Sequence, residues 1–332
     1  TRNVGLMLPY TPLHAALFDR LAPRAPLPPA LVMTSANPHG EPLCLGNREA
    51  LARLDHLADA WLLHDRDILV RVDDSVLGVA PRPLRARQPE SGSGKADAAT
   101  APHAVDPFFY RRARGYVPRP VFLPPFGEGG EEGDPTVLGA GAELKGTICL
   151  TRGHEAFVGQ HIGDLENPAT LGFYEEVAAH LESLLEVRPK AIVCDLHPDF
   201  LSTRYAEARA AREGLPLWRL QHHAAHGASV LAENNCYEPA LALCLDGTGL
   251  GDDGTIWGGE LIHMDLGRAD WSRLGRLAPF ALPGGEAAIR EPWRIALALR
   301  IQAGEDAGPA RWDAEYAMAA TAVREMLARG LN

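Results

Sequence analysis

The sequence predicts an α/β protein of two domains, and three observations support that prediction. Its 332 residues are about twice the usual length of one domain. Short apolar runs typical of buried strands alternate with longer segments whose apolar residues recur at helical spacing. Two stretches rich in proline and glycine, residues 81–107 and 124–135, interrupt this pattern. They predict a first domain over residues 1–123, a linker over 124–135 and a second domain over 136–332.

The first domain is expected to mix helices and strands. Strands are expected over residues 4–8, 31–34, 61–64 and 74–79. Helices are expected over residues 12–21 and 47–57, with Asn47 placed to cap the second helix. The stretch 81–107 has few large apolar residues, so burial cannot offset its ordering entropy and a flexible loop is expected.

The second domain alternates more regularly. Strands are expected over residues 136–141, 146–151, 155–160, 191–195, 216–221, 240–246 and 255–264. Helices are expected over residues 169–186, 198–212 and 222–234. The order βββαβαβαββ is that of a ribonuclease H-like nucleotide-binding fold, although the pattern by itself supports only the α/β class.

Composition limits the classes of function. The formal net charge is −11, with 43 acidic and 32 basic residues, whereas proteins that bind nucleic acid in bulk are usually basic. No run approaches 18 apolar residues, so no membrane-spanning segment is expected. The five cysteines are dispersed and form no CxxC motif, a pattern typical of reduced thiols. We therefore expect a cytoplasmic protein that binds neither nucleic acid nor membranes.

A pair of histidines is the first candidate for chemistry. His222 and His226 lie four residues apart where a predicted strand passes into a helix, a spacing that places both imidazoles on one helical face. Asp246 ends the apolar strand that follows and is a candidate third ligand for a metal ion. The alternative is two solvated or core histidines without a metal.

A glycine-rich loop follows Asp246. The segment DGTGLGDDG, residues 246–254, begins at the end of a strand. Glycines allow backbone N–H groups to approach phosphate oxygens, and a hydroxyl adds a further donor. The alternative is the turn of a β-hairpin, for which Asp-Gly is a strong signal. Both interpretations can hold, because the loop joins two strands in either case.

Two further segments are candidates for phosphate binding. TSAN, residues 34–37, ends a predicted strand with small polar side chains, but Pro38 and Gly40 also suit a simple Asx or Ser turn. The local sequence favours the turn. The basic run RRARG, residues 111–115, is by itself typical of a solvated face, whereas beside a phosphate its guanidinium groups would clamp the anion.

Longer segments carry a resemblance to a known family. In chain order they include LVMTSANPHGEPL, WLLHDRDILVRVDDSV, FFYRRARGYVPRP, GAELKGTICL, QHIGDLEN, CDLHPDFLSTRYA, QHHAAHGASVLAEN, LDGTGLGDDGTIWGGE and LPGGEAAIREPWRIAL. Over about residues 4–299 the chain resembles the HypF family of carbamoyltransferases, which act in nickel–iron hydrogenase maturation. So long an ordered set of matches is more specific than any one motif.

The resemblance implies a fold and an activity. The fold is a partial YrdC-like α/β domain followed by a ribonuclease H-like domain of the ASKHA, Kae1-like type. In that family the YrdC-like domain uses ATP to adenylate carbamate derived from carbamoyl phosphate. The Kae1-like domain then transfers the carbamoyl group to the C-terminal cysteine thiol of the partner HypE, for synthesis of the cyanide ligand. The implied cofactors are ATP with Mg²⁺ and a divalent metal, iron or zinc.

The resemblance also assigns residues. The nucleotide motif SxN of YrdC-like domains matches Ser35 and Asn37, and a later binding strand contains Arg71 and Ser75. An Arg-x-Gly element matches Arg112 or Arg114. The metal ligands match His222, His226 and Asp246, and the phosphate loop matches Gly247, Thr248 and Gly249.

The chain also departs from the family pattern. An acylphosphatase domain and two zinc-finger modules are absent from the sequence. The Lys-x-Arg motif of YrdC-like domains would precede Thr1, and the Kae1-like domain should continue beyond Asn332, so an internal fragment is expected. Two alternatives remain open. One is an O-carbamoyltransferase acting on a small-molecule hydroxyl, and the other is a fragment that binds nucleotide and partner without turnover.

Overall fold

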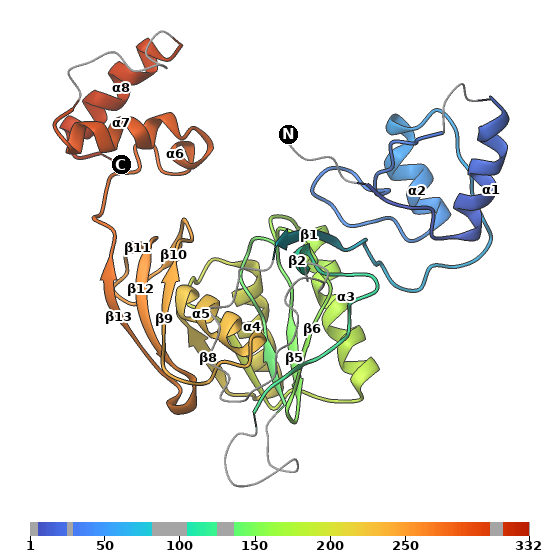
Figure 1. Cartoon of the computed structure of the whole chain (residues 1–332), viewed down its shortest axis with the longest axis horizontal. Helices are drawn as coiled ribbons and strands as arrows, with labels where there is room; N and C mark the ends of the chain where they lie inside the picture. Colours follow the sequence, from blue (N-terminus) through green and yellow to red (C-terminus); the bar gives the residue numbers. More distant parts are fainter. Residues whose placement is uncertain (1–5, 25–28, 82–104, 125–135, 306–314, 332) are drawn as a thin grey trace, which may run out of the picture. The chain divides into compact units, whose positions relative to one another are not determined.

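The computed structural model of the chain describes residues 6–24, 29–81, 105–124, 136–305 and 315–331. The loop expected over 81–107 and the linker expected over 124–135 lie almost entirely outside the described residues. Two compact units are present (Figure 1). The first comprises Thr1–Cys194 and Pro198–Trp218, and the second comprises Asp195–His197 and Arg219–Asn332.

The N-terminal elements are short and follow local capping rules. α1 (Pro12–Leu21) starts after Thr11, whose Oγ1 accepts a hydrogen bond from the N–H of His14 at 3.1 Å. α2 (Asn47–Leu54) continues into a 3₁₀ turn, η2 (Asp55–Leu57). β1 (Val76–Pro81) pairs antiparallel with β2 (Val105–Arg111). The two predicted helices are therefore confirmed, and the strand expected over 74–79 is displaced by two residues.

Several strand predictions for this region were wrong. The described residues of 4–8, together with 31–34 and 61–64, have no strand pairing. A strand is stable only beside a partner strand, and the side chains of Leu31, Val32 and Met33 are all exposed. The predicted cap of α2 was also wrong. Gly46 precedes the helix, and the Asn47 amide donates instead to the carbonyl of His64.

A six-stranded mixed sheet forms the main body of the first unit, with strand order β3-β6-β5-β4-β7-β8. β4 runs parallel to β7 and antiparallel to β5, and β5 runs antiparallel to β6. The strands are β3 (Val121–Phe122), β4 (Val137–Gly139), β5 (Cys149–Arg152), β6 (Glu155–Val158), β7 (Ala191–Asp195) and β8 (Leu217–Leu220). β4, β6, β7 and β8 each fall within a segment predicted to be extended, and β5 ends one residue beyond its predicted range.

Two helices share the core of this sheet. α3 (Pro168–Leu185) is capped by Asn167, whose side chain accepts from the N–H of Thr170 at 2.9 Å. α4 (Leu201–Glu213) ends at Gly214 in the left-handed conformation. Leu138, Leu150 and Ile192 of the sheet are fully buried with apolar residues of both helices. Both helices agree with the predicted ranges to within three residues.

The second unit contains α5 (His222–Glu233) and a three-stranded antiparallel sheet of order β13-β12-β9. Its strands are β9 (Ala240–Cys244), β12 (Glu260–Asp265) and β13 (Asp270–Arg276). A separate hairpin pairs β10 (Gly249–Leu250) with β11 (Ile256–Trp257). The single strand expected over 255–264 is thus two strands, because Gly259 adopts a φ of +84° between them.

Three helices follow: α6 (Glu286–Arg290), α7 (Trp293–Gln302) and α8 (Ala317–Ala328). Trp293 and Leu297 pack against Ala320 and Val323 in a small separate core. The chain as described is therefore α/β, as predicted. Within the described residues, no helix has both the length and the apolar character that a membrane crossing requires.

Candidate metal and phosphate site

The start of α5 places the two candidate histidines. Gln221 follows β8 directly and is buried, and its side-chain oxygen accepts from the N–H of Ala224 at 2.9 Å. This cap starts the helix immediately after the strand. His222 is consequently the first residue of the helix, and His226 lies one turn later on the same face.

Asp246, beyond the end of β9, completes a compact cluster. Its Oδ2 lies 3.0 Å from Nε2 of His222 and 3.4 Å from Nε2 of His226. The two Nε2 atoms are 3.2 Å apart. The structure therefore brings together the three residues that the sequence suggested as metal ligands.

Asp195, at the end of β7, is a further member of this site and was not predicted from the sequence. Its Oδ2 lies 2.7 Å from Nδ1 of His222, and its Oδ1 accepts from the N–H of His197 at 2.8 Å. The hydrogen bond that His222 donates to Asp195 raises the pKa of His222, although burial opposes the shift. An Nδ1–H donated to Asp195 leaves Nε2 free as a ligand. The available signal was an acid ending a buried strand, where parallel sheets present functional groups.

The cluster fits a divalent cation. Ligand atoms bonded to one zinc ion at about 2.0–2.2 Å lie roughly as far apart as these three do, and imidazole nitrogen suits zinc and iron. Burial would raise the pKa of Asp246, but the N–H of Gly247 and the charges of His222 and His226 outweigh it and lower that pKa. Side-chain exposures of 55% for His226 and 41% for Asp246 leave one side open, as in catalytic metal sites.

The glycine loop lies directly against the histidines. A Cβ atom on Gly249 would approach Cε1 of His223 to 2.7 Å and Cβ of His222 to 2.9 Å, so only glycine fits at this position. Gly247 and Thr248 are exposed. The loop forms the β10–β11 hairpin, as the alternative interpretation predicted. Its phosphate-binding role remains a prediction, and the hairpin is compatible with it.

A pocket of about 380 Å³ adjoins the cluster. His226 and Asp246 line one part of it, and apolar residues of α5 and β9 line most of the remainder. The candidate metal ligands therefore face a space that can accept a small substrate.

The candidate residues of the first unit form a second group. Asn37 closes a turn, because its amide donates to the carbonyls of Glu41 at 2.8 Å and Pro38 at 3.1 Å. The Ala36 carbonyl accepts from the N–H of Cys44, and the neighbouring Leu43 carbonyl accepts from Nε of Arg71 at 2.7 Å. The structure thus connects the turn containing Ser35 to Arg71, while Ser35 itself is exposed.

Ser75 and Arg114 are also connected. The Ser75 hydroxyl donates to the carbonyl of Arg114 and accepts from the N–H of Ala113, both at 2.9 Å. The Arg114 guanidinium pairs with Asp74 at 3.1 Å and remains half exposed. Its exposed guanidinium is therefore accessible to an anion.

Arg112 has a different environment from Arg114. Its guanidinium donates to the carbonyls of Val158 at 2.9 Å, Tyr116 at 2.9 Å and Arg119 at 2.7 Å. These bonds connect the segment after β2 to β6. The contacts favour a structural role for Arg112, and of the two alternatives for the Arg-x-Gly element they favour Arg114.

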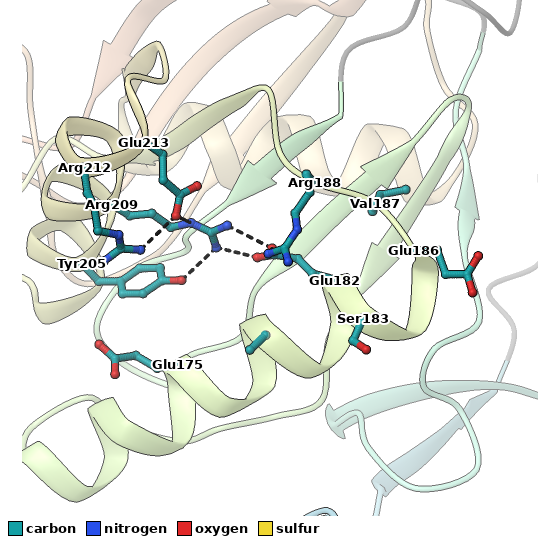
Figure 2. A pocket seen from close by; sticks show the side chains of 11 residues that line it. Glu175, Glu182, Ser183, Glu186, Val187, Arg188, Tyr205, Arg209, Arg212 and Glu213 are labelled. Carbon is teal, nitrogen blue, oxygen red and sulfur yellow. Dashed lines mark hydrogen bonds and ion pairs between the residues drawn. The ribbon is translucent and has the colours of Figure 1, made fainter.

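A second pocket, of about 540 Å³, lies between α3 and α4. Figure 2 shows the guanidinium of Arg209 between Glu182, Tyr205 and Glu213. Arg209 and Glu182 are joined by hydrogen bonds of 2.5 and 3.0 Å and are almost fully buried. Because these charged groups pair with one another, we interpret the residues of this pocket as a structural connection between α3 and α4.

Comparison with known proteins assigns the chain to a family. Family models match residues 132–233 (HypF Kae1-like domain), 242–332 (carbamoyltransferase, Kae1-like domain, second subdomain) and 1–88 (Sua5, YciO and YrdC proteins, described as "Telomere recombination"). The chain is 50% identical over 303 residues to carbamoyltransferase HypF2 of Cupriavidus necator, covering 89% of this chain and 34% of that protein. The chain belongs to the HypF family.

Other HypF proteins are also similar to this chain. HypF of Rhizobium leguminosarum bv. viciae is 47% identical over 93% of this chain and 36% of its own length. A crystal structure of full-length HypF in the phosphate- and nucleotide-bound form is 36% identical with a TM-score of 0.73, over 90% of this chain and 34% of that one. The HypF of T. kodakarensis is 34% identical with the same TM-score, over 89% of this chain and 34% of that one.

Two consequences follow from these matches. The predicted fold class, a YrdC-like part followed by a Kae1-like domain of α/β architecture, is confirmed. The chain spans about one third of the length of the HypF proteins it matches.

Proposed function

We propose that this chain supplies nucleotide-binding and metal-binding parts of an ATP-dependent, cytoplasmic carbamoyltransferase of nickel–iron hydrogenase maturation. The observation that supports it most is the cluster of His222, His226 and Asp246, whose ligand atoms lie within 4.8 Å of one another. The glycine loop follows Asp246 and packs on His222 and His223. Membership of the HypF family adds the carbamoyl group as the group transferred.

The chemistry explains why activation is needed. Carbamate is a poor electrophile, because an oxyanion adjoins its carbonyl carbon. Attack of carbamate derived from carbamoyl phosphate on the α-phosphate of ATP gives carbamoyl-adenylate and pyrophosphate, and AMP is then a good leaving group. We assign the nucleotide contacts of this step to Ser35, Asn37, Arg71, Ser75 and Arg114. Arg112 holds the segment that carries Arg114.

The transfer step is assigned to the second group of residues. A divalent cation bound there supplies Lewis-acid polarisation of the carbamoyl carbonyl. His222, His226 and Asp246 hold that cation, and Asp195 orients His222. The backbone N–H groups of residues 247–249 and the hydroxyl of Thr248 bind phosphate oxygens. The acceptor is the C-terminal cysteine thiol of a HypE-like partner.

The test combines the purified chain with ATP, Mg²⁺, carbamoyl phosphate and a HypE-like protein. We expect AMP and pyrophosphate to form, and mass spectrometry to find one carbamoyl group on the partner's C-terminal cysteine. A His226→Ala variant serves as the control that lacks a metal ligand and is expected to leave the partner unmodified.

Three other results would overturn the proposal in different ways. Carbamoylation of a small hydroxyl compound in place of the thiol would identify an O-carbamoyltransferase. Binding of ATP and partner without AMP release would identify a binding fragment. Absence of ATP binding would remove the nucleotide site itself.

A further inference from the structure

Trp257 is the bulkiest buried side chain that packs on the glycine loop. It is 2% exposed and lies opposite Gly249 in the β10–β11 hairpin. Its Nε1–H donates to Oδ1 of Asp253 at 2.9 Å. A two-stranded hairpin of this length is marginal by itself, so the hairpin depends on contacts made from outside it.

Two side chains contact the indole ring. The guanidinium carbon of Arg273, on β13, lies 3.9 Å from the ring centroid, a close cation–π contact. The imidazole of His223 stacks on the ring with centroids 6.3 Å apart and an angle of 28° between the planes. His223 is fully buried and adjoins the candidate ligand His222. Trp257 therefore connects β13 to the start of α5.

Asp253 holds this arrangement together. Its Oδ1 accepts from the N–H and the hydroxyl of Thr255 at 3.0 and 2.6 Å, and its Oδ2 accepts from Arg273 at 3.0 Å. The hydrogen bonds from Thr255 keep the pKa of Asp253 below its usual range. Arg273 also pairs with the buried Glu260 at 3.6 Å. Asp253 and Arg273, the charged residues in contact with Trp257, are thus held in place by hydrogen bonds and ion pairs.

The glycines of the loop pack directly on these rings. A Cβ atom on Gly251 would lie 2.0 Å from Nε1 of Trp257, and one on Gly249 would lie 2.7 Å from Cε1 of His223. The side chain of Gln221 reinforces the same packing, because its amide donates to the carbonyl of Leu250 at 3.2 Å. Contacts with Trp257, His223 and Gln221 therefore fix the path of the loop backbone.

We propose that Trp257, held by Asp253 and Arg273, is a positioning residue that fixes residues 246–251 against the start of α5. It thereby sets the direction of the backbone N–H groups that bind the phosphates of a nucleotide. The part of this inference that concerns the ligand rests on the proposed function. The part that concerns the loop does not, and the two are tested separately.

The first test measures the loop without any ligand. Arg273→Met removes the cation–π contact and both ion pairs, and amide hydrogen exchange is followed in residues 247–251. We expect exchange about tenfold faster there, a size typical of losing one such contact, while the β9–β12 amides stay unchanged. Arg276→Met, an exposed arginine on the same strand, is the matched control. Unchanged exchange in the loop would overturn the inference.

The second test measures the ligand. Binding of a non-hydrolysable ATP analogue is titrated against wild type, Arg273→Met and Trp257→Phe, each carrying Asn37→Ala to remove the nucleotide contacts of the first unit, and metal content is determined for each. We expect an approximately tenfold weaker Kd for Arg273→Met and an intermediate one for Trp257→Phe, which keeps an aromatic ring, with metal content unchanged. A merely structural role would lower the melting temperature and leave the Kd of the folded variant at the wild-type value.

The outcomes separate the two proposals. If the wild type does not bind the analogue, the proposed function fails, whatever the exchange rates show. If the wild type binds and Arg273→Met binds equally well, the positioning role of Trp257 fails alone. Arg273→Lys, which keeps the charge, replaces Arg273→Met if the latter does not fold, and the same shifts in reduced size are expected.

Discussion

Two clusters of charged side chains in this chain contrast in how their polar groups are used. Between α3 and α4, Arg209 donates to Glu182, Tyr205 and Glu213, and both members of the central pair are less than 10% exposed. At the start of α5, His222 and His226 face Asp246 at 3.0–3.4 Å, with one side open to solvent. The first cluster is closed, in the sense that its charged groups pair with one another. The second is open, because its ligand atoms surround a position that a cation can occupy.

The difference shows why pocket size alone identifies no function. The larger pocket belongs to the closed cluster, and the pocket of about 380 Å³ adjoins the open one. A buried ion pair that satisfies itself has little left to offer a ligand. Imidazole nitrogens 3.2 Å apart with a carboxylate between them retain lone pairs that a cation can accept.

The largest effect is expected at Arg209. Arg209→Met leaves the carboxylate of Glu182 buried with its main partner removed, which costs about 3–5 kcal/mol of unfolding free energy. Urea unfolding, with hydrogen exchange in α3 and α4 to identify the transition, measures the loss. Arg204→Met, on the same helix with a 59% exposed side chain, is the control.

A double variant tests whether the unpaired charge of Glu182 causes this loss of stability. Replacing both members, with Glu182→Leu added to Arg209→Met, is expected to recover most of the stability, since no unpaired charge remains. Metal content should be unaffected in both variants. A loss below about 1 kcal/mol for Arg209→Met would contradict the closed-cluster interpretation.

The next largest effect is expected at His226. His226→Ala removes one of three ligands, so zinc or iron affinity should fall by more than the roughly 10–100-fold that loss of an outer hydrogen-bond partner costs. Elemental analysis and competition with a chelator measure the change. Metal stabilises only the form that binds it, so added zinc should raise the melting temperature of the wild type and leave the variant unchanged. His180→Ala, an exposed histidine on α3, is the control, and retained metal in His226→Ala would refute the site.

Replacing Asp195 is expected to have a smaller effect on metal affinity at the same site. Asp195→Asn keeps the size of the side chain but removes the charge that faces Nδ1 of His222 at 2.7 Å. We expect metal affinity to fall by about 10–100-fold, as for other outer partners of histidine ligands. Asp199→Asn, a 71% exposed carboxylate four residues later, should have no effect. Equal affinities for Asp195→Asn and the wild type would exclude Asp195 from the site.

Sequence patterns predicted most elements of residues 136–264, because their apolar residues recur at strand or helix spacing. They did not predict β13, α6, α7 or α8. β7 occupies the predicted range, and α5 is one residue shorter than predicted. The strands expected over 31–34 and 61–64 failed because strand formation depends on a partner that local sequence does not reveal. The same limit explains why β2, whose start lies in a proline-rich stretch, was not predicted.

The candidate site was predictable to a similar degree. His222 and His226 share a helical face whatever the tertiary structure, and Asp246 follows an apolar run, so three ligands followed from local pattern. Asp195 is 27 residues from His222, and its role depends on how β7 lies relative to α5. Arg112 resembled a phosphate ligand in the sequence, whereas its bonds to three carbonyls exist only in the folded chain.

The smallest effect is expected at the rim of the closed cluster. Arg188 also contacts Glu182, at 3.2 Å, but its side chain is 87% exposed. Exposed ion pairs contribute about 0–1 kcal/mol and are screened by salt, and Glu182 keeps both hydrogen bonds from Arg209 when Arg188 is lost. Arg188→Met should therefore lower the unfolding free energy by less than about 1 kcal/mol in low salt.

High salt distinguishes the exposed Arg188–Glu182 ion pair from the buried Arg209–Glu182 pair. In about 1 M NaCl, where the screening length falls to roughly 3 Å, the difference between Arg188→Met and the wild type should disappear. The loss caused by Arg209→Met should persist, because that pair is buried and little screened. If Arg188→Met instead destabilises as strongly as Arg209→Met, Glu182 requires both cations. The cluster would then not be closed by Arg209, and the contrast with the open histidine site would rest on exposure alone.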